Sequence, residues 1–550
     1  MEAFQQSGES YRGSAQLDQK PDAAWLVQNA ADLLQSIPAS YFKSKRWFGS
    51  KSREIAGYGL NDIAVLREEP VLLGMALLEI RYAQGKSELY HLPLAIQETE
   101  KAPENIKQQD GNIIARLSGS NGDWLVYDGF LNDQFCRALY QNMYEGMSLP
   151  SLYGIFKFAN IPGRISQPEV RSIKRVSTEQ SNTSIIYNNN LILKGFRKLT
   201  AGQNPDVEVP FFLTTRTDFK YVPKVGGYFE YQPDKGGPAY SMGSLQDFVP
   251  NEGDGWNFTL DQVREYFRQV EHYLESKGSP DEAETATLAE QFAQDYKVLA
   301  RRLGEITGEM HNALASDASQ PDFAPEVITQ EDVQHWQSAI SELVRRVTGN
   351  LRSQLERYSL EMRENLKKVV DHEQDYLRQV NSLAELVEEQ VCKTRFHGDY
   401  HLGQVLKTGR DFVILDFEGE PARSLEERRA KYNPLKDVAG MLRSFNYAAY
   451  TILFETQSHA GDQPHKVDLE IWAESWEELA RQAFIEGYCE ATGRNEGARY
   501  LPTSAQVQTD ITKVFELEKA FYELNYEFNN RPTWVPIPLK GLLRIIQPAS

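Results

Sequence analysis

The residues best suited to chemistry lie in the segment RFHGDYHLGQVL and in the VILDFEGEP that follows it. A carboxylate at Asp399 is followed by the amide of Gln404, and a second carboxylate, Asp416, comes after an apolar run. One carboxylate can orient a hydroxyl nucleophile and accept its proton, while a second carboxylate and an amide oxygen can hold magnesium against phosphates. The segment therefore has the combination that phosphoryl transfer needs.

The spacing also predicts how these groups come together. Short apolar runs on both sides of Lys407 to Asp411 predict a hairpin, which would fold the strand before Asp416 onto the strand after Gln404. Both oxygen donors would then face one pocket, with Asp399 on the preceding loop.

Two other interpretations of this segment remain open. His397, Asp399 and His401 could serve only as polar groups that cap a loop, with Asp416 and Glu418 as exposed strand residues. Alternatively, histidines four residues apart can share a helix face and bind zinc. Gly398 and the lack of a third plausible ligand disfavour that zinc site.

A second candidate surface lies near the C-terminus. Lys519, Tyr522 and Tyr526 are three and four residues apart, which predicts that they share one face of a helix. Aromatic rings stack on sugar rings, and phenol and ammonium groups donate to hydroxyls, so this face suits a disaccharide. The tyrosines could equally belong to a core face.

Composition limits the possible classes of protein. The chain has 550 residues with 41% hydrophobic and 25% charged residues, which is typical of a globular protein of three to four domains or lobes. With 59 Lys and Arg against 78 Asp and Glu, the net charge is −19, so unselective binding to nucleic acid or to an anionic membrane is disfavoured.

The basic, aromatic stretch from Tyr41 to Arg53 is the one segment that could contradict this expectation. Its cations are expected instead to pin the N-terminal module to an acidic neighbour. The 3 cysteines are far apart, which indicates neither a disulfide framework nor a thiolate zinc site and favours a reducing cytoplasm. No apolar stretch is long enough to span a bilayer.

The texture of the chain changes along its length. Residues 1–20 are polar and are predicted to form a disordered tail, and a helix is expected from about residue 21 to residue 36. Residues 21–130 then form a helix-plus-sheet module, and 131–250 a second sheet-rich module in which a turn from Tyr187 to Asn190 joins two strands. Residues 251–550 are mostly helical, so the fold class is α+β.

The motif from His397 to Gln404, with the DFEGEP that begins at Asp416, resembles the aminoglycoside phosphotransferase-like kinases and, among them, most closely the maltokinases. The superfamily pattern has Asn where this chain has Gln404, and Gln matches the maltokinase version. Further blocks resemble maltokinases in the right order, including FKSKRWFGSKSR, NPLKDVAGMLRSFNYA and NNRPTWVPIPLKG, so the resemblance covers about residues 25–543.

The resemblance implies a bilobal, eukaryotic-protein-kinase-like fold. An N-terminal cap module (21–130) would sit on a sheet-rich N-lobe (131–250), followed by a helical C-lobe (251–550) with the catalytic loop and sugar site. The strand that ends at Lys194 would deliver the lysine that contacts nucleotide phosphates, paired with Glu208. The segment SNTS from Ser181 to Ser184 would replace a phosphate-covering loop, although it lacks glycines.

The remaining site residues follow from the same resemblance, in part supported by the chemistry above. Asp399 is the expected catalytic base. The hinge that meets the nucleotide base would contain Gln246, Phe248 and Val249; the metal ligands would be Gln404, Asp416 and Glu418; and the substrate would contact Arg395, His401, Lys519, Tyr522, Tyr526 and Arg531.

The activity that the resemblance implies is transfer of phosphate from ATP, with Mg²⁺, to the anomeric hydroxyl of maltose, giving maltose 1-phosphate for α-glucan synthesis. Trehalose synthase is the partner that it suggests, because such kinases also occur fused to that enzyme. Two alternatives stay open: a kinase of the same fold for glucosamine, another sugar or an aminoglycoside, and a non-catalytic partner of trehalose synthase.

Overall fold

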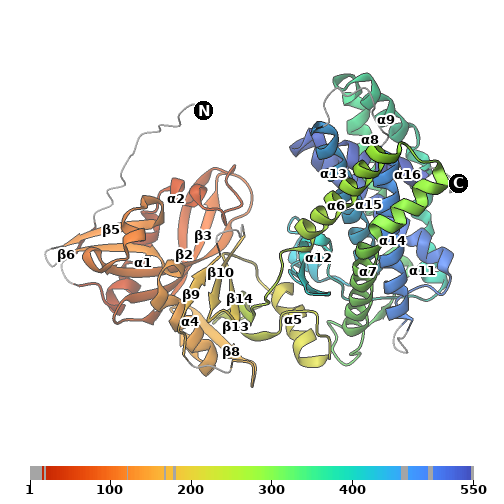
Figure 1. Cartoon of the computed structure of the whole chain (residues 1–550). Coiled ribbons are helices and arrows are strands. Elements are labelled where there is room, and N and C mark those ends of the chain that lie inside the picture. The colour runs from red at the N-terminus through yellow and green to blue at the C-terminus, as the bar shows by residue number, and fades with distance from the viewer. Residues whose placement is uncertain are drawn as a thin grey trace. The chain divides into compact units, whose positions relative to one another are not determined.

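The computed structural model describes residues 15–17, 20–119, 122–165, 169–176, 181–459, 469–493 and 499–546. It divides into two compact units, one formed by Met1–Phe211 with Pro223–Val249 and the other by Phe212–Val222 with Pro250–Ser550. Strands dominate the first unit and helices the second (Figure 1), which confirms the predicted α+β class.

The first unit contains two seven-stranded sheets. The first sheet has the order β1-β5-β6-β4-β3-β2 with β12 added beside β4, and it is antiparallel except where β1 runs parallel to β5. Of the predicted disordered tail, 15–17 instead form β1, and most of the rest lies outside the described residues. The strands of this sheet are β1 (Ala15–Leu17), β2 (Ile55–Arg67), β3 (Leu72–Tyr82), β4 (Glu88–Glu98), β5 (Ile113–Gly119), β6 (Gly122–Asp128) and β12 (Lys198–Leu199).

The first sheet is buried on both faces because its central strands are apolar at nearly every position. Leu72, Ala76 and Leu78 of β3 point to the side covered by α1 (Ala23–Gln35) and α2 (Ala39–Ser44), whose apolar faces complete one core. Alternate residues such as Leu73 and Met75 point to the other side. The helix predicted over residues 21–36 is confirmed by α1.

That second core joins the first sheet to the second one. It includes apolar residues of α4 (Asp133–Glu145) and of the second sheet, so the regions 21–130 and 131–250 pack into one compact unit. The second sheet is antiparallel, with the order β7-β8-β13-β14-β11-β10-β9. Its strands are β7 (Ser148–Pro150), β8 (Gly154–Asn160), β9 (Ile173–Arg175), β10 (Asn182–Tyr187), β11 (Leu191–Phe196), β13 (Val225–Pro233) and β14 (Tyr240–Asp247).

The predicted turn between Tyr187 and Asn190 is confirmed. Asn188 and Asn189 have φ values of 52° and 56°, and Tyr187 pairs with Leu191 across the two strands. The loop between the paired ends has three residues, and the N–H of Asn190 donates to the carbonyl of Tyr187 at 3.0 Å to close the turn. Asn tolerates positive φ better than most residues. The short helices α3 (Glu104–Lys107) and α5 (Pro205–Arg216) complete the helices that begin in this unit.

The second unit is a helical assembly with two small two-stranded sheets. Two of its long helices, α7 (Glu282–Leu314) and α14 (Leu469–Thr492), approach closely at Gly304 and Gly487, where a Cβ atom would lie 2.0 Å from a carbonyl oxygen of the partner helix. Its helices of five residues or more are α6 (Gly255–Lys277), α7 (Glu282–Leu314), α8 (Gln330–Gln354), α9 (Leu360–Asp371), α10 (Glu373–Val380), α12 (Leu425–Arg429), α13 (Leu435–His459), α14 (Leu469–Thr492), α15 (Ala505–Asn530) and α16 (Pro536–Ile546).

The two small sheets of this unit flank the loop that carries the candidate catalytic residues. One pairs β15 (Glu326–Val327) with β16 (Cys392–Lys393), and the other pairs β17 (Val405–Thr408) with β18 (Asp411–Ile414). The second confirms the hairpin that the sequence predicts around Lys407 to Asp411.

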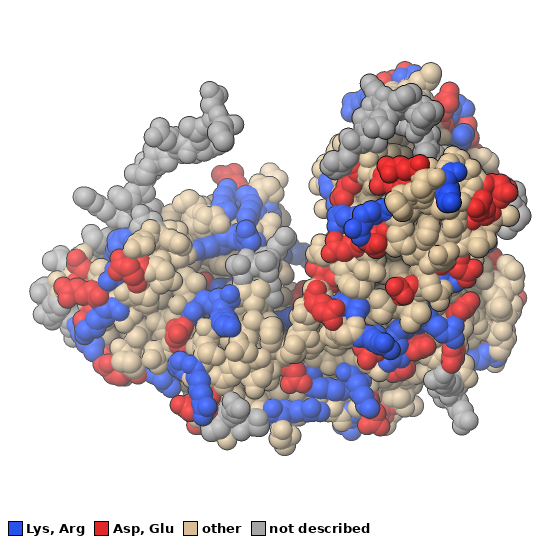
Figure 2. All heavy atoms as spheres, in the orientation of Figure 1, with Lys and Arg blue, Asp and Glu red and all other residues tan. Residues whose placement is uncertain are grey.

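The surface carries charges of both signs. On the face shown in Figure 2, Lys and Arg side chains are interspersed with Asp and Glu over both units. In the described part of the chain, no helix is both long and apolar enough to cross a membrane.

Candidate active site

One buried carboxylate holds the loop between β16 and β17 in place through hydrogen bonds. Asp437 lies in the first turn of α13 and is 2% exposed. Its carboxylate accepts a hydrogen bond from the backbone N–H of His397 at 2.7 Å and another from that of Gly398 at 3.0 Å. Its Oδ2 also lies 3.1 Å from Nε2 of the buried His311 of α7. Gly398 has φ 88°, a conformation that favours glycine, so this position is fixed by both backbone shape and hydrogen bonds.

The two histidines of the loop serve its conformation. His397 donates from Nε2 to the carbonyl of Leu415 at 2.7 Å, and its Nδ1 accepts the N–H of Asp399 at 3.3 Å. His401 caps the short 3₁₀ helix η6 (Leu402–Gln404), with Nδ1 accepting the N–H of Gly403 at 3.0 Å. Because residues 397–401 are not helical, the shared helix face required by the zinc alternative does not form.

The hairpin brings the backbone segments of two of the three predicted metal ligands, Gln404 and Asp416, side by side. Val405 pairs with Ile414, and the N–H of Leu415 donates to the carbonyl of Gln404 at 2.8 Å. Asp416 follows immediately and has φ 55°, in the left-handed region that costs a non-glycine residue about 1 kcal/mol or more and is enriched at functional sites.

An amide oxygen and a carboxylate suit Mg²⁺, which prefers oxygen ligands and usually takes its remaining ligands from water and phosphates. Within the described residues, no group of three or more His, Cys, Asp and Glu side chains could hold a metal ion. Glu418 follows in the same loop, where its backbone carbonyl accepts from Arg428 at 3.1 Å.

A cavity of about 520 Å³ in the second unit opens beside Asp399. Most of the substrate residues predicted from the sequence line it: His401, Lys519, Tyr522, Tyr526 and Arg531. Sequence reasoning missed other residues of its wall, of which the most prominent are Trp256, Glu420, Tyr447, Glu523, Glu527 and Trp534.

Arg395, the remaining predicted substrate residue, does not line this cavity. It is 2% exposed, and its guanidinium carbon lies 5.2 Å from the ring centroid of Phe323. Its assignment as a substrate residue stays a prediction.

Lys519 of α15 connects the charged groups of the cavity. Its Nζ lies 3.3 Å from Oδ1 of Asp399 and 3.3 Å from Oε1 of Glu420. Burial alone would lower the pKa of Lys519, but the two carboxylates outweigh it and raise the pKa well above its usual value. For Glu420, burial acts in the raising direction, and Lys519 and Arg423 nevertheless hold its pKa at about 2.

The other carboxylates of the cavity also have cationic partners. Glu523 lies 2.8 Å from Arg443, and Glu527 lies 2.7 Å from Arg531. Burial lowers the pKa of His401 despite the nearby Asp399, so His401 is neutral near pH 7. Because its Nδ1 accepts a hydrogen bond, the proton of this neutral ring lies on Nε2.

Aromatic rings form much of the remaining wall. Tyr522 is 39% and Tyr526 45% exposed, so neither is the core residue that the alternative interpretation required. Tyr447 and Trp534 stack with centroids 6.2 Å apart, and Arg531 lies 4.6 Å over the ring of Trp534. The cavity thus combines apolar ring faces with hydrogen-bonding groups, which is typical of a site for a polyhydroxylated ring.

In the first unit, Lys194 on β11 is 8% exposed and lies 3.3 Å from Oδ2 of Asp206. The sequence singled out Glu208, which is buried in the same first turn of α5, and missed Asp206 as a partner. Gln246, near the end of β14, is buried and donates from Nε2 to Ser244. Phe248 donates its N–H to the carbonyl of Asn190, and Val249 ends the unit.

Comparison with known proteins agrees with this architecture. Residues 41–131 match the family model of the maltokinase N-terminal cap domain. A glucosamine kinase from Streptacidiphilus jiangxiensis is 22% identical over 66% of this chain and 71% of its own, and one from Mycolicibacterium smegmatis is 24% identical over 67% and 78%. The solved structure of a glucosamine kinase in complex with glucosamine, ADP and inorganic phosphate superposes with a TM-score of 0.63 at 18% identity, covering 95% of this chain and all of the other.

The chain therefore has a kinase-like fold, as the sequence predicts. Residues 41–131, which match the cap-domain model, form strands β2 to β6 of the first sheet, while α1 lies before the matched range and α4 after it.

Proposed function

We propose that this protein is an ATP- and Mg²⁺-dependent sugar kinase that phosphorylates the anomeric hydroxyl of maltose to maltose 1-phosphate. The observation that carries the proposal is the position of Asp399, which faces an aromatic-lined cavity of about 520 Å³ at the end of a firmly held loop. The maltokinase cap domain supports the same assignment.

In this proposal, Asp399 orients the anomeric hydroxyl and accepts its proton as the oxygen attacks the terminal phosphorus of ATP. Lys519 remains charged and fixes the Asp399 carboxylate from one side. Neutral His401 has an Nε2–H with which to donate to a sugar oxygen. Lys194 would contact the nucleotide phosphates as a point charge, and Gln246 to Val249 would meet the base.

Gln404 and Asp416, with Glu418 as a further candidate, would hold the magnesium ion. When bound, such an ion neutralises charge on the phosphate oxygens and keeps the transferred group in line.

The charges of the cavity support the proposal of maltose over glucosamine. The ammonium of glucosamine needs a carboxylate that is not already neutralised, whereas Glu420, Glu523 and Glu527 each have a cationic partner within 3.3 Å. Two sugar rings also need more than one aromatic face, and the wall offers several. Glucosamine is the second candidate, because the relatives named above are glucosamine kinases.

The acceptor is tested by measuring ATP consumption with Mg²⁺ and maltose, glucose, trehalose, glucosamine or kanamycin. We expect kcat/KM for maltose to exceed that for every other acceptor. A preference for glucosamine would keep the kinase and replace the acceptor. Absence of turnover on any acceptor would favour a non-catalytic partner of trehalose synthase.

Asp437 provides a test of the loop that carries Asp399. We expect Asp437→Asn to lower kcat about tenfold to hundredfold, because an amide leaves one of the two backbone N–H groups without an acceptor, at about 1–3 kcal/mol. The measurement is kcat at saturating maltose and ATP, with the melting temperature as a check of folding. Asp411→Asn, at the half-exposed partner of Arg302, is the matched control. Equal kcat in both variants would contradict this role of Asp437.

A further inference from the structure

Arg197 links the cap domain to the hairpin that carries Lys194. Its guanidinium donates from Nη2 to Oδ2 of Asp128 at 2.7 Å and from Nε to Oγ1 of Thr183 at 2.8 Å. Asp128 ends β6 of the first sheet and lies inside the matched cap domain, whereas Thr183 belongs to β10 of the second sheet. One side chain thus bonds to both sheets at once.

The position of this guanidinium is closely constrained. Arg197 is 2% exposed, and its guanidinium carbon lies 4.9 Å from the ring centroid of Trp47 and 4.7 Å from that of Phe130, both in the cap domain. A planar guanidinium held between rings and paired with a buried carboxylate cannot be replaced by an ammonium without losing this geometry.

The bonded groups adjoin Lys194. Across β10 and β11, Thr183 pairs with Gly195 and Ser184 pairs with Lys194. Phe130 packs against the same place, since a Cβ atom on Gly195 would lie 2.4 Å from its ring. The cap domain therefore contacts β11 at the residue that follows Lys194 and, through Arg197, holds the strand beside it.

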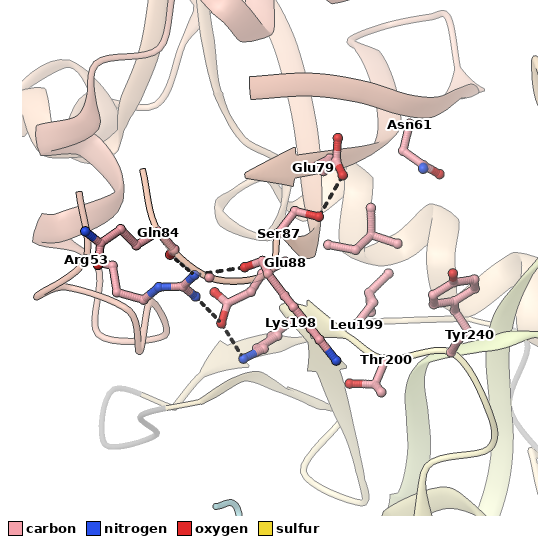
Figure 3. Close-up of a pocket in the computed structure, with 14 residues that line it drawn as sticks. Arg53, Asn61, Glu79, Gln84, Ser87, Glu88, Lys198, Leu199, Thr200 and Tyr240 are labelled. Carbon is pink, nitrogen blue, oxygen red and sulfur yellow. Dashed lines mark hydrogen bonds and ion pairs between the residues drawn. The ribbon is translucent and has the colours of Figure 1, made fainter. Parts of the chain in front are cut away.

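A second connection follows directly along the chain. Lys198 and Leu199 form β12, which pairs with Tyr90 and Leu89 of β4. Lys198 lies 2.7 Å from Glu88, which also binds Arg53 at 3.3 Å (Figure 3). Arg53 belongs to the basic stretch from Tyr41 to Arg53, and Glu88 lies in the same module, so this ion pair is internal to the module rather than a contact with a neighbour.

The cavity of about 990 Å³ beside this junction does not by itself indicate a ligand, since several of its charged side chains pair with one another. Burial alone would raise the pKa of Glu88, but hydrogen bonds from Lys198, Tyr82 and Tyr90 hold it at about 2. These interactions secure the start of β12 to the cap domain across the neutral pH range.

We propose that Arg197 is a positioning residue through which the cap domain fixes the β10–β11 hairpin, and with it Lys194, for binding the phosphates of the nucleotide. This inference rests on the proposed kinase function. It assigns the cap domain a role in nucleotide affinity, although neither Asp128 nor Arg197 would contact the nucleotide.

The test compares variants at the three members of this connection. We expect Arg197→Lys, Asp128→Asn and Thr183→Val each to raise KM for ATP, by about tenfold for the two charged positions, because a hydrogen bond between charged groups is stronger than one between neutral groups. KM for maltose is expected to stay within about twofold, since the cap domain does not line the acceptor cavity. Arg171→Lys, the same change at an exposed arginine of this unit, is the control.

A second readout separates positioning from folding. The rise in melting temperature on adding MgADP requires no sugar, and we expect it to shrink in the three variants and not in the control. Variants that melt earlier but keep the KM for ATP and the full MgADP response of the wild type would overturn the inference. If the wild-type protein turns over ATP but the variants show neither a higher KM for ATP nor a smaller MgADP response, the proposed function stands and the inference alone fails.

Discussion

Replacing Asp399 by Asn is expected to lower kcat about 10²- to 10⁴-fold, which is the usual contribution of a general base. The amide has nearly the same shape as the carboxylate but cannot accept the proton of the sugar hydroxyl. It also removes the charge that Lys519 faces at 3.3 Å, so the sugar site loses both its base and part of its charge balance.

The measurement is kcat at saturating maltose and ATP, together with the change in melting temperature on adding MgADP. The nucleotide response should remain, because Asp399 acts on the acceptor. Asp411→Asn serves again as the control for the substitution itself. An Asp399→Asn protein that retained more than about a tenth of wild-type kcat would contradict the assignment of the base.

Asp416→Asn is expected to have the other large effect, a loss of about a thousandfold in kcat and a much higher Mg²⁺ requirement. Removing the one full negative charge of the proposed ligand pair weakens metal binding, and the ion supplies several kcal/mol of charge stabilisation. The substitution should not disturb the backbone, because Asn tolerates the left-handed conformation well and can keep the φ of 55° at this position.

This variant is assayed by titrating Mg²⁺ at fixed ATP and maltose. A weakened site should shift the half-saturating Mg²⁺ concentration upward, and high Mg²⁺ should restore part of the activity. If both the half-saturating concentration and kcat matched the wild type, Asp416 would not be a ligand. An Asp411→Asn protein titrated in parallel shows the behaviour of an intact site.

Local patterns predicted the parts of the site that are local in sequence. The hairpin after Gln404 and the common helix face of Lys519, Tyr522 and Tyr526 depend on spacing within one segment, and the structure has both. Asp206 shows the limit of this reasoning. It lies in the same first turn of α5 as the predicted Glu208, and spacing alone did not single it out as a partner of Lys194.

Contacts between segments that are distant in the chain could not be predicted from local sequence patterns. Trp256 and Trp534 reach the cavity from the start of α6 and from the turn before α16, and each looks like an isolated aromatic residue after a loop. Arg395 adjoins the catalytic motif in sequence, yet its side chain is buried against Phe323. Likewise, β12 is a two-residue strand whose addition to the first sheet joins regions that the sequence treats as separate modules.

The most direct test of the central claim is phosphorus NMR of the product formed from maltose, ATP and Mg²⁺. If Asp399 and the aromatic cavity direct transfer to the anomeric hydroxyl, the product shows one phosphate on that carbon, with its phosphorus coupled to the anomeric proton, and Asp399→Asn forms almost none. A phosphate on any other carbon of maltose, or product formation that does not depend on Asp399, would contradict the account.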